Sequence, residues 1–224
     1  MCVNFDPADR AGILRLFARW NLTVPAFEVP KETWQDRLAP IVVHPDECEM
    51  YCTIASFGMV PQRYKPPKVK TLTTMNARAE TLGERRNFKP FWDTGQLALV
   101  PITGFYEPFY ETREGPSTRW RIGMANGSPF AVAGLWRTWI GAEGEVERSF
   151  TQITVNADDH PLMKRFHKWD DVKRSLVIVA PDDYEVWLTC RDPDLARTFL
   201  KLYPAELMTA APAPLPPRKK KAVL

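Results

Sequence analysis

The sequence has no apolar run of the ~18–20 residues that a membrane-spanning helix needs, so an anchor of that type is not expected. Its first residues carry neither a basic segment nor an apolar core, and no secretory signal peptide is expected. Cysteine is scarce, with four in 224 residues, and without an export signal these thiols are expected to be reduced. These absences exclude a small disulfide-stabilised scaffold and predict a cytoplasmic protein without a membrane partner.

Charge of one sign is also lacking, because 30 Lys and Arg residues nearly balance 27 Asp and Glu residues and leave a formal net charge of +3. Such a balance does not by itself identify a nucleic-acid-binding protein, so the distribution of the cations has to decide. The 45% of hydrophobic residues is ordinary for a globular domain and excludes wholesale disorder and fibrous repeats.

The C-terminal end differs in composition from the rest of the chain. We expect residues 1–205 to form a single domain and residues 206–224 to form a flexible tail. The tail is rich in proline, has no apolar period and contains the basic run Arg218-Lys219-Lys220-Lys221. Two interpretations of that run stay open: it contacts a phosphate backbone, or it only helps to keep the chain in solution.

Proline and tryptophan are abundant, with 21 and eight residues. Turn-forming residues separate short apolar segments typical of strands, at residues 41–43, 51–60, 97–106, 130–140, 150–155 and 176–180. Helices are predicted from Asp6 toward Trp20, over 182–188 and over 193–202, with Asp6 as the N-cap of the first. Because regular helical crossovers between strands are missing, the pattern predicts an α+β fold with mostly antiparallel strands.

His44, Cys48 and Cys52 follow one another at intervals of four residues, which on a helix would place three metal-binding groups on one face. A closed zinc site needs a fourth ligand, and no second closely spaced pair of Cys or His residues supplies one. We therefore assign no metal site and expect no cofactor.

Cys2 is the most informative residue, because removal of Met1 would leave a cysteine with a free α-amine. In such a 1,2-aminothiol the amine has a pKa near ~8 and the thiol near ~8.5, so both nucleophiles are partly available at neutral pH. An aldehyde would form a Schiff base with the amine, and the neighbouring thiolate would close a thiazolidine ring. The competing interpretation is a cysteine without a function.

Cations gather on both sides of the segment 75–81, which reads Met-Asn-Ala-Arg-Ala-Glu-Thr. Arg63 and Tyr64 precede it among several prolines, and Arg85 and Arg86 follow it. A single DNA strand suits such a surface, since bases stack on aromatic rings while cations follow the phosphates. A solvated loop without a partner is the alternative interpretation.

Two groups suited to proton transfer lie at the ends of apolar segments. Glu107 ends the strand predicted at 97–106, where a cleft would raise the pKa of its carboxyl group. His167 lies shortly before the strand predicted at 176–180 and is a better acid/base candidate than His160, which lies in a loop. A solvated glutamate and a structural histidine are the alternatives.

Taken together, these residues resemble the SOS-response-associated peptidase (SRAP) family, whose members crosslink covalently to abasic sites in single-stranded DNA. The resemblance spans residues 1 to about 190 and rests on four motifs in the family's order. These are Cys2, the run Asn76-Ala77-Arg78-Ala79-Glu80-Thr81, the run Gly104-Phe105-Tyr106-Glu107 and a late histidine before a hydrophobic strand. The resemblance implies a barrel-like β-sheet core flanked by short helices.

The resemblance also implies roles for individual residues. Cys2 would be the nucleophile, and Asn76 would position its amine or the aldehyde. Glu107 and His167 would form the acid/base pair. The residues expected to contact DNA are Arg78, Arg86, Thr154, Tyr64 and Lys173. The same catalytic groups would hydrolyse the bond between Met1 and Cys2, unless an aminopeptidase removes Met1.

The partner implied by the resemblance is single-stranded DNA that contains abasic sites, without an obligate protein partner. When bound to DNA the protein would associate with the nucleoid.

Several segments depart from the family pattern. Val3-Asn4 stands where the family has Gly-Arg, and Pro108 stands where it has Trp. The family's compact His-x-Arg-Met-Pro becomes the longer segment from His167 to Ser175, in which Lys173 or Arg174 replaces the Arg. The loop from Gly58 to Asn76 is also longer than is typical.

Three other functions stay open. An N-terminal-nucleophile amidohydrolase would also expose Cys2 and use its own α-amine as the base. A non-catalytic module that binds single-stranded DNA would not need Cys2, and a degenerate SRAP paralogue would have lost activity through the altered segment after His167. The basic and aromatic loop favours DNA over the amidohydrolase.

Overall fold

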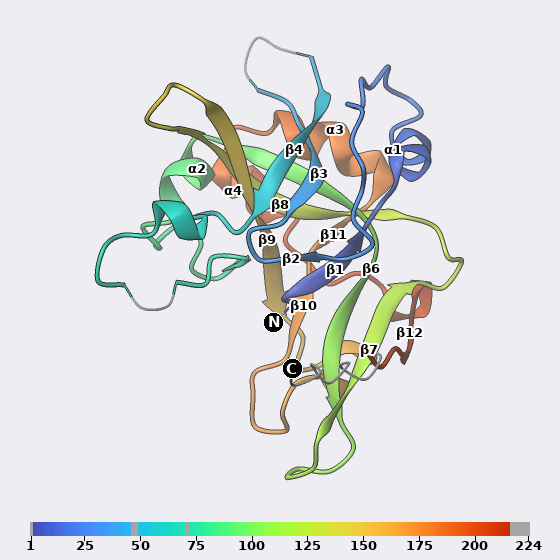
Figure 1. Ribbon diagram of the computed structural model, residues 1–224. Helices are drawn as coiled ribbons and strands as arrows, with labels where there is room; N and C mark the ends of the chain where they lie inside the picture. The colour runs from blue at the N-terminus through green and yellow to red at the C-terminus, as the bar shows by residue number, and fades with distance from the viewer. Residues whose placement is uncertain (1, 46–48, 70–71, 216–224) are drawn as a thin grey trace, which may run out of the picture.

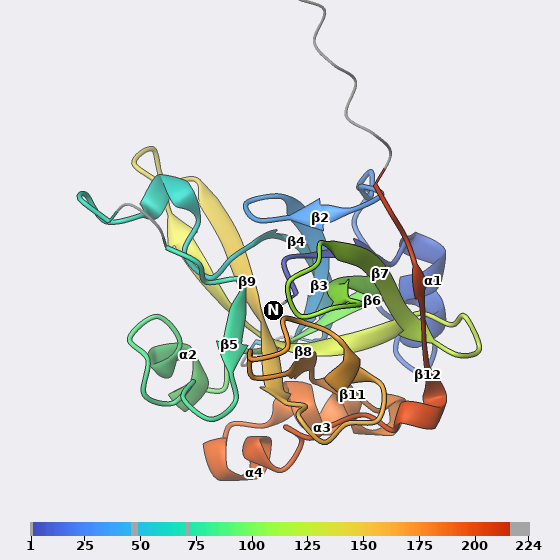
Figure 2. The same ribbon diagram turned by 90° about the horizontal axis from the view of Figure 1, so that it is seen from below.

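The computed structural model describes residues 2–45, 49–69 and 72–215, where strands outweigh short helices (Figures 1 and 2). The strands are β1 (Asn4–Pro7), β2 (Thr33–Trp34), β3 (Leu38–Val43), β4 (Tyr51–Phe57), β5 (Asn76–Arg78), β6 (Leu97–Tyr110), β7 (Ser117–Met124), β8 (Phe130–Ile140), β9 (Val146–Asn156), β10 (Arg174–Leu176), β11 (Ile178–Val179) and β12 (Met208–Pro212). The α-helices are α1 (Arg10–Leu16), α2 (Lys89–Asp93), α3 (Tyr184–Thr189) and α4 (Pro193–Arg197). Short 3-10 helices are η1 (Gln62–Tyr64), η2 (Met163–Arg165), η3 (Pro181–Asp183) and η4 (Ala205–Leu207). In the described part of the chain, no helix has the length and apolar character to cross a membrane.

Five strands close on themselves to form a barrel. β3 pairs with β4 and with β6, β6 pairs with β8, β8 pairs with β9, and β9 pairs with β4. All of these pairings are antiparallel except that of β4 with β9. The prediction of an α+β fold with a mostly antiparallel, barrel-like sheet and short flanking helices is confirmed.

Alternate residues of the barrel strands face two different apolar clusters, as the two-residue period of a strand requires. Along β6, Leu97 and Leu99 pack with Trp187 of α3 in a cluster that joins the helices to the outside of the barrel. Ala98 and Val100 belong to the second cluster, which faces the opposite side of the strand and fills the barrel interior. Helices whose apolar residues face the barrel, such as α3, therefore cover its outer face.

Phenylalanine rings fill the interior next to β1. The Phe57 ring centroid lies 5.1 Å from that of Phe5 and 5.2 Å from that of Phe150, and none of the three side chains is exposed. Because Phe5 belongs to β1, these ring contacts fasten the N-terminal strand to the barrel.

The first helix begins later than predicted, because Asp6 and Pro7 form part of β1 and pair with β6. Helix α1 has Asp9 as its N-cap instead, and the Asp9 carboxylate accepts a hydrogen bond from the Gly12 amide at 2.7 Å. The Asp6 carboxylate accepts a hydrogen bond from the Tyr106 hydroxyl at 2.8 Å. The capping prediction was wrong here because strand pairing and this contact outweigh a local propensity.

The folded domain extends beyond residue 205, so the tail predicted for 206–224 begins too early. Strand β12 lies within that segment and pairs antiparallel with β7 along its whole length, anchored by the buried Met208. The edge of β7 offers backbone hydrogen-bond partners, so the segment needs no apolar period to become a strand. The basic run 218–221 lies outside the described residues.

Each strand predicted from the sequence overlaps an observed strand; the bounds predicted at 130–140 are those of β8, and the others have shifted ends. β4 stops at Phe57 rather than at residue 60, because Gly58 takes a φ of +120° that breaks the extended backbone. β6 continues to Tyr110, and α4 stops at Arg197 rather than at residue 202.

The substitution Phe57→Ala is expected to lower the free energy of unfolding by about 3–5 kcal/mol, because it leaves a cavity among packed rings. Urea denaturation of the variant and the wild-type protein measures this loss. Val186→Ala, at a half-exposed position of α3, is the control and should change the free energy by less than about 0.5 kcal/mol. A loss below about 1 kcal/mol for Phe57→Ala would contradict the assignment of Phe57 to the barrel interior.

Candidate active site

Cys2 lies two residues before the start of β1 and reaches the interior of the barrel. β1 pairs antiparallel with β6 through Phe5 and Phe105, which carries residue 2 toward the part of β6 that holds Glu107. The Cys2 side chain is 1% exposed, and its thiol donates a hydrogen bond to the Asn4 carbonyl oxygen at 3.2 Å. The strand pairing therefore brings the predicted nucleophile and the predicted acid to the same place.

Asn76 holds the backbone of Cys2. Its side-chain Nδ2 donates a hydrogen bond to the Cys2 carbonyl oxygen at 2.6 Å. Asn76 is the first residue of β5, which pairs in parallel with β9 through Gln152. The predicted pair of Cys2 and Asn76 is thus in direct contact, although 74 residues separate the two in the sequence.

Glu107 and His167 form a buried pair, with His167 Nδ1 at 3.3 Å from Glu107 Oε2. The backbone amide of His167 donates to the Pro108 carbonyl oxygen at 2.8 Å, which fastens the histidine to β6. His167 has a φ of +65°, a left-handed conformation that is uncommon for a residue other than glycine. Such strain persists only where the surrounding contacts fix the residue.

Burial moves the pKa values of this pair in opposite senses. It raises the pKa of Glu107 to about 7 and lowers that of His167 to about 4, because a poorly solvated site disfavours both charged forms. His167 Nε2 lies 3.3 Å from the Arg174 carbonyl oxygen, which can accept a hydrogen bond but cannot donate one. The neutral ring therefore donates from Nε2 and accepts at Nδ1, which suits a protonated Glu107.

The Cys2 thiol is held in its protonated form. Burial raises the pKa of Cys2, and the negative charge of Glu107 raises it further. A thiolate at this position therefore needs a base that takes its proton at the moment of reaction. Ionised Glu107 is a base of this kind.

Arg174 ties the Asn76 segment to the barrel. Its guanidinium group makes two hydrogen bonds to the Glu80 carboxylate, at 2.8 and 2.9 Å, and is 5% exposed. Nη2 also donates to the Thr154 carbonyl oxygen at 2.6 Å and to the Thr154 hydroxyl at 3.1 Å. The predicted DNA contact Thr154 is therefore buried and is bound by Arg174.

Lys173 lies next to Arg174 but engages the loop that follows His167. Its Nζ donates to the backbone carbonyl of Lys168 and lies 3.4 Å from that of Trp169. Of the two cations that replace the family's Arg, Arg174 takes the buried position and Lys173 stays near the surface.

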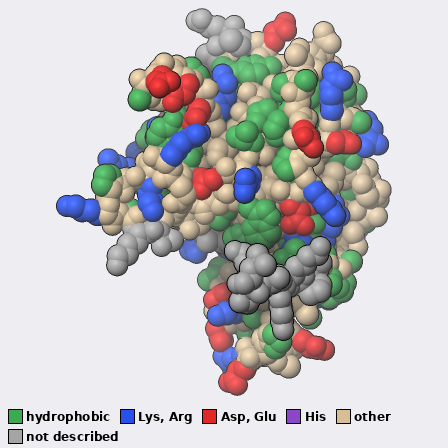
Figure 3. All heavy atoms as spheres, in the orientation of Figure 1, with side chains coloured by type: hydrophobic (Ala, Val, Ile, Leu, Met, Phe, Trp, Pro, Cys, Tyr) green, Lys and Arg blue, Asp and Glu red, His purple; other side chains and the backbone are tan. Residues whose placement is uncertain are grey.

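Arg78 and Arg86, which were predicted to contact phosphate, are both exposed. Arg78 ends β5, two residues after Asn76, and Arg86 lies in the turns before α2. The face seen in Figure 3 carries Lys, Arg, Asp and Glu side chains intermixed with apolar groups, without a continuous basic surface.

Tyr64, the predicted aromatic wedge, stacks on Trp139 of β8, with ring centroids 4.3 Å apart and an angle of 5° between the rings. Its hydroxyl donates a hydrogen bond to Glu147 at 3.1 Å. Arg137 covers the Trp139 ring, 3.5 Å from its centroid. Tyr64 therefore packs on the β8–β9 hairpin and is not among the residues that contact Cys2.

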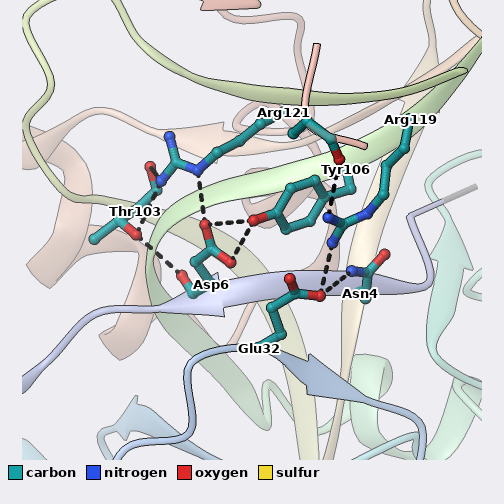
Figure 4. Close-up of polar contacts among 8 residues, drawn as sticks. Asn4, Asp6, Glu32, Thr103, Tyr106, Arg119 and Arg121 are labelled. Atoms are coloured by element: carbon teal, nitrogen blue, oxygen red, sulfur yellow. Dashed lines mark hydrogen bonds and ion pairs between the residues drawn. The ribbon is translucent and has the colours of Figure 1, made fainter. Parts of the chain in front are cut away.

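A polar network on the opposite face of β1 and β6 was not predicted from the sequence (Figure 4). The Asp6 carboxylate accepts hydrogen bonds from the Tyr106 hydroxyl and from Arg121 Nε, the latter at 2.7 Å. Glu32 accepts from Asn4 Nδ2 at 3.0 Å and from Arg119 at 2.7 Å. Arg119 also lies over the Tyr106 ring, 3.3 Å from its centroid. These contacts fasten β1 to β6 and β7.

The metal hypothesis weighed for His44, Cys48 and Cys52 concerns a segment that is only partly described, since Cys48 lies outside the described residues. Cys52 is buried in β4. Among the described residues, no group of three or more His, Cys, Asp or Glu side chains is arranged to hold a metal ion.

The chain is similar to known proteins in both sequence and fold. A family model described as SOS response associated peptidase (SRAP) matches residues 14–214, which include Asn76, Glu107 and His167 but not Cys2. The abasic site processing protein YobE of Bacillus subtilis is 32% identical over 159 residues, which are 69% of this chain and 67% of that protein. The abasic site processing protein YoqW of Bacillus phage SPbeta is also 32% identical over 159 residues, 69% of this chain and 65% of that protein. The match thus spans about two thirds of these relatives.

Solved structures share the fold. A crystal structure of a Bordetella bronchiseptica protein superimposes with a TM-score of 0.83 and 32% sequence identity, covering 96% of this chain and 100% of that one. A Bacteroides thetaiotaomicron protein gives a TM-score of 0.71 at 20% identity, covering 93% of this chain and 90% of that one. The second likeness concerns the fold alone.

The substitution Arg174→Met is expected to lower the free energy of unfolding by about 2–4 kcal/mol, because it leaves the Thr154 carbonyl and the Glu80 carboxylate without their cation. The neighbouring substitution Lys173→Met is the matched control and should cost less than about 1 kcal/mol, since its ammonium group is near solvent. Urea denaturation of both variants provides the comparison. Equal losses would contradict a clamp centred on Arg174.

Proposed function

Because this chain belongs to the SOS response associated peptidase (SRAP) family, we propose that it processes abasic sites in DNA by capturing them on Cys2. The observation that carries the proposal is the meeting of Cys2, Asn76 and the Glu107–His167 pair at one end of the barrel. The names of the relatives YobE and YoqW, both abasic site processing proteins, support the same substrate.

The first step exposes the reactive amine. Hydrolysis of the peptide bond between Met1 and Cys2 adds one water molecule, releases methionine and leaves Cys2 with a free α-amine. The groups around Cys2 or a separate aminopeptidase perform this step. The product is a 1,2-aminothiol on a backbone whose carbonyl is held by Asn76.

The second step captures the lesion. The ring-opened sugar of an abasic site carries an aldehyde, and the Cys2 amine adds to it to give a carbinolamine. Loss of water gives an imine, the thiol sulfur adds to the imine carbon, and its proton passes to the nitrogen. One water molecule is lost overall, and the product is a thiazolidine that links protein and DNA.

Glu107 and His167 move the protons in this scheme. With a pKa near 7, Glu107 is present in both forms at neutral pH, so it donates a proton to the departing hydroxyl and accepts one from the thiol. His167 holds the Glu107 carboxyl group through Nδ1, and the Arg174 carbonyl oxygen holds the other ring nitrogen. Asn76 positions Cys2 so that its amine meets the aldehyde.

Binding of the DNA strand is assigned to cations around this site. Arg78 and Arg86 are exposed and contact phosphates, while Lys173 stands near the loop after His167. Thr154 contributes through Arg174, and Tyr64, with the Arg63 guanidinium over its ring, contacts the strand farther along the β8–β9 hairpin. The preferred substrate is single-stranded DNA, without an obligate protein partner, and the bound protein is associated with the nucleoid.

Covalent capture is tested on a denaturing gel with single-stranded DNA that carries one abasic site. The wild-type protein, shown by mass to have lost Met1, is expected to give a shifted band. Cys2→Ala should abolish this band, because it removes the thiol that closes the ring, whereas Cys190→Ala, at another buried thiol, should retain it. Absence of a band with the processed wild-type protein would contradict covalent capture and favour a module that only binds DNA.

The rate of adduct formation is expected to depend on pH through Glu107. Above about pH 7 the carboxyl group loses the proton needed for departure of water, so the rate should fall, and at lower pH protonation of the amine should also slow the reaction. Glu107→Gln should lower the rate about 10²- to 10⁴-fold and remove the fall above pH 7.

Single-turnover gel assays between about pH 5 and 9 measure both profiles. A fall above pH 7 that persists unchanged in Glu107→Gln would assign it to another group and contradict the role of Glu107.

A further inference from the structure

A cavity of about 290 Å³ adjoins the Glu107–His167 pair on the side of the β6–β7 hairpin. Its lining consists of Phe109, Tyr110, Glu111, Lys164, Arg165, His167, Trp169 and Lys173. The cavity therefore lies between two elements: the hairpin and the loop of residues 168–173 that follows His167. Because His167 is part of the wall, an occupant of the cavity would lie next to one member of the Glu107–His167 pair.

Phe109, one of the lining residues, belongs to a cluster of packed aromatic rings. The Phe109 centroid lies 5.1 Å from that of Trp120 and 6.3 Å from that of Phe166. Arg165 extends over this cluster, 5.4 Å from the Trp120 centroid. Phe166 is fully buried and pairs with Phe109 through an isolated backbone bridge, so this part of the wall is rigid.

Two contacts, at Asp170 and at Lys173, join the loop 168–173 to its surroundings. Arg113 of the hairpin donates to the Asp170 carboxylate, with Nε 3.2 Å from Oδ2. The Lys173 backbone amide donates to Asp158 Oδ1 at 2.8 Å. Trp169, which directly precedes Asp170, is 59% exposed and lines the cavity. The loop thus presents an indole ring in a defined position instead of burying it.

Among the residues that line the cavity, cations outnumber acids. Lys164, Arg165 and Lys173 line the cavity, against the single carboxylate of Glu111. An exposed aromatic ring beside several cations suits a nucleotide, whose base stacks on the ring while the cations hold its phosphate. The volume lies at the lower end of the ~300–1,000 Å³ typical of small-molecule sites, which suits one nucleotide rather than a longer segment.

We propose that this cavity binds the nucleotide next to the abasic site, with its base against Trp169 and its phosphate near Lys164 and Lys173. This inference rests on the proposed function, because it identifies how the strand continues from the lesion that Cys2 captures. It also predicts a dependence on one neighbouring base that the chemistry at Cys2 does not require.

The test uses single-stranded oligonucleotides with one abasic site and compares single-turnover rates of adduct formation at limiting protein. In two of them the neighbour on the 5′ or the 3′ side is a tetrahydrofuran residue, which keeps the phosphate but has no base and no aldehyde. One of the two base removals, and not the other, is expected to slow adduct formation by the wild-type protein about 5-fold or more. A stacked base contributes about that much to binding.

With the intact strand, Trp169→Ala should react as slowly as the wild-type protein does with the strand that lacks the stacked base. Removal of either neighbouring base should not slow this variant further. Trp169→Phe keeps a stacking ring and should retain most of the rate and the one-sided sensitivity. Leu195→Ala, at an apolar position of α4 that is 48% exposed, is the control and should behave as the wild-type protein.

Two results would overturn the inference while leaving the proposed function intact: equal wild-type rates with and without either neighbouring base, or a full rate for Trp169→Ala. Absence of any adduct with the wild-type protein would instead reject the proposed function, and this inference with it.

Discussion

The antiparallel pairing of β1 with β6 is the constraint on which the candidate site depends. The first residues of a chain are usually poorly ordered unless they are tied down. Here the Phe5 ring packs inside the barrel, while Asp6 is bound by Tyr106 and Arg121 on the opposite face of the strand. Both faces of β1 are therefore fixed, and residue 2 is delivered to one position beside Glu107. A terminal nucleophile without these anchors would lose the advantage of fixed orientation.

The same pairing explains why the acid and the histidine are buried. A closed barrel has few places where a polar side chain reaches the interior, and Glu107, near the C-terminal end of β6, takes one of them. Burial raises the pKa of the carboxyl group and lowers that of His167, so His167 is neutral at neutral pH and the two do not form an ion pair. A carboxyl group that titrates near neutrality serves as both donor and acceptor, which the proposed sequence of carbinolamine, imine and ring requires.

The sequence predicted the fold class and the residues that meet at Cys2 better than it predicted the supporting contacts. The α+β class followed from short apolar segments between turns, and Asn76, Glu107 and His167 were identified from motifs. The Glu80–Arg174 contact joins residues 94 positions apart, and no local period indicates which of two adjacent cations is buried. Strand β12 escaped prediction for a similar reason, since its backbone partners on β7 are distant in the sequence. In these cases contacts between residues distant in the sequence determined the structure, and local secondary-structure propensity did not.

In the proposed chemistry, burial also sets the order in which the bonds form. The raised pKa of the Cys2 thiol keeps the sulfur protonated, and a thiol is a far weaker nucleophile than a thiolate. The amine freed by removal of Met1 is therefore the group that first meets the aldehyde. Protonation of the resulting imine places a positive charge next to the sulfur, which favours the thiolate and makes the adjacent carbon more electrophilic. The ring thus closes only after an aldehyde has reacted, and a strand without a lesion meets no activated sulfur.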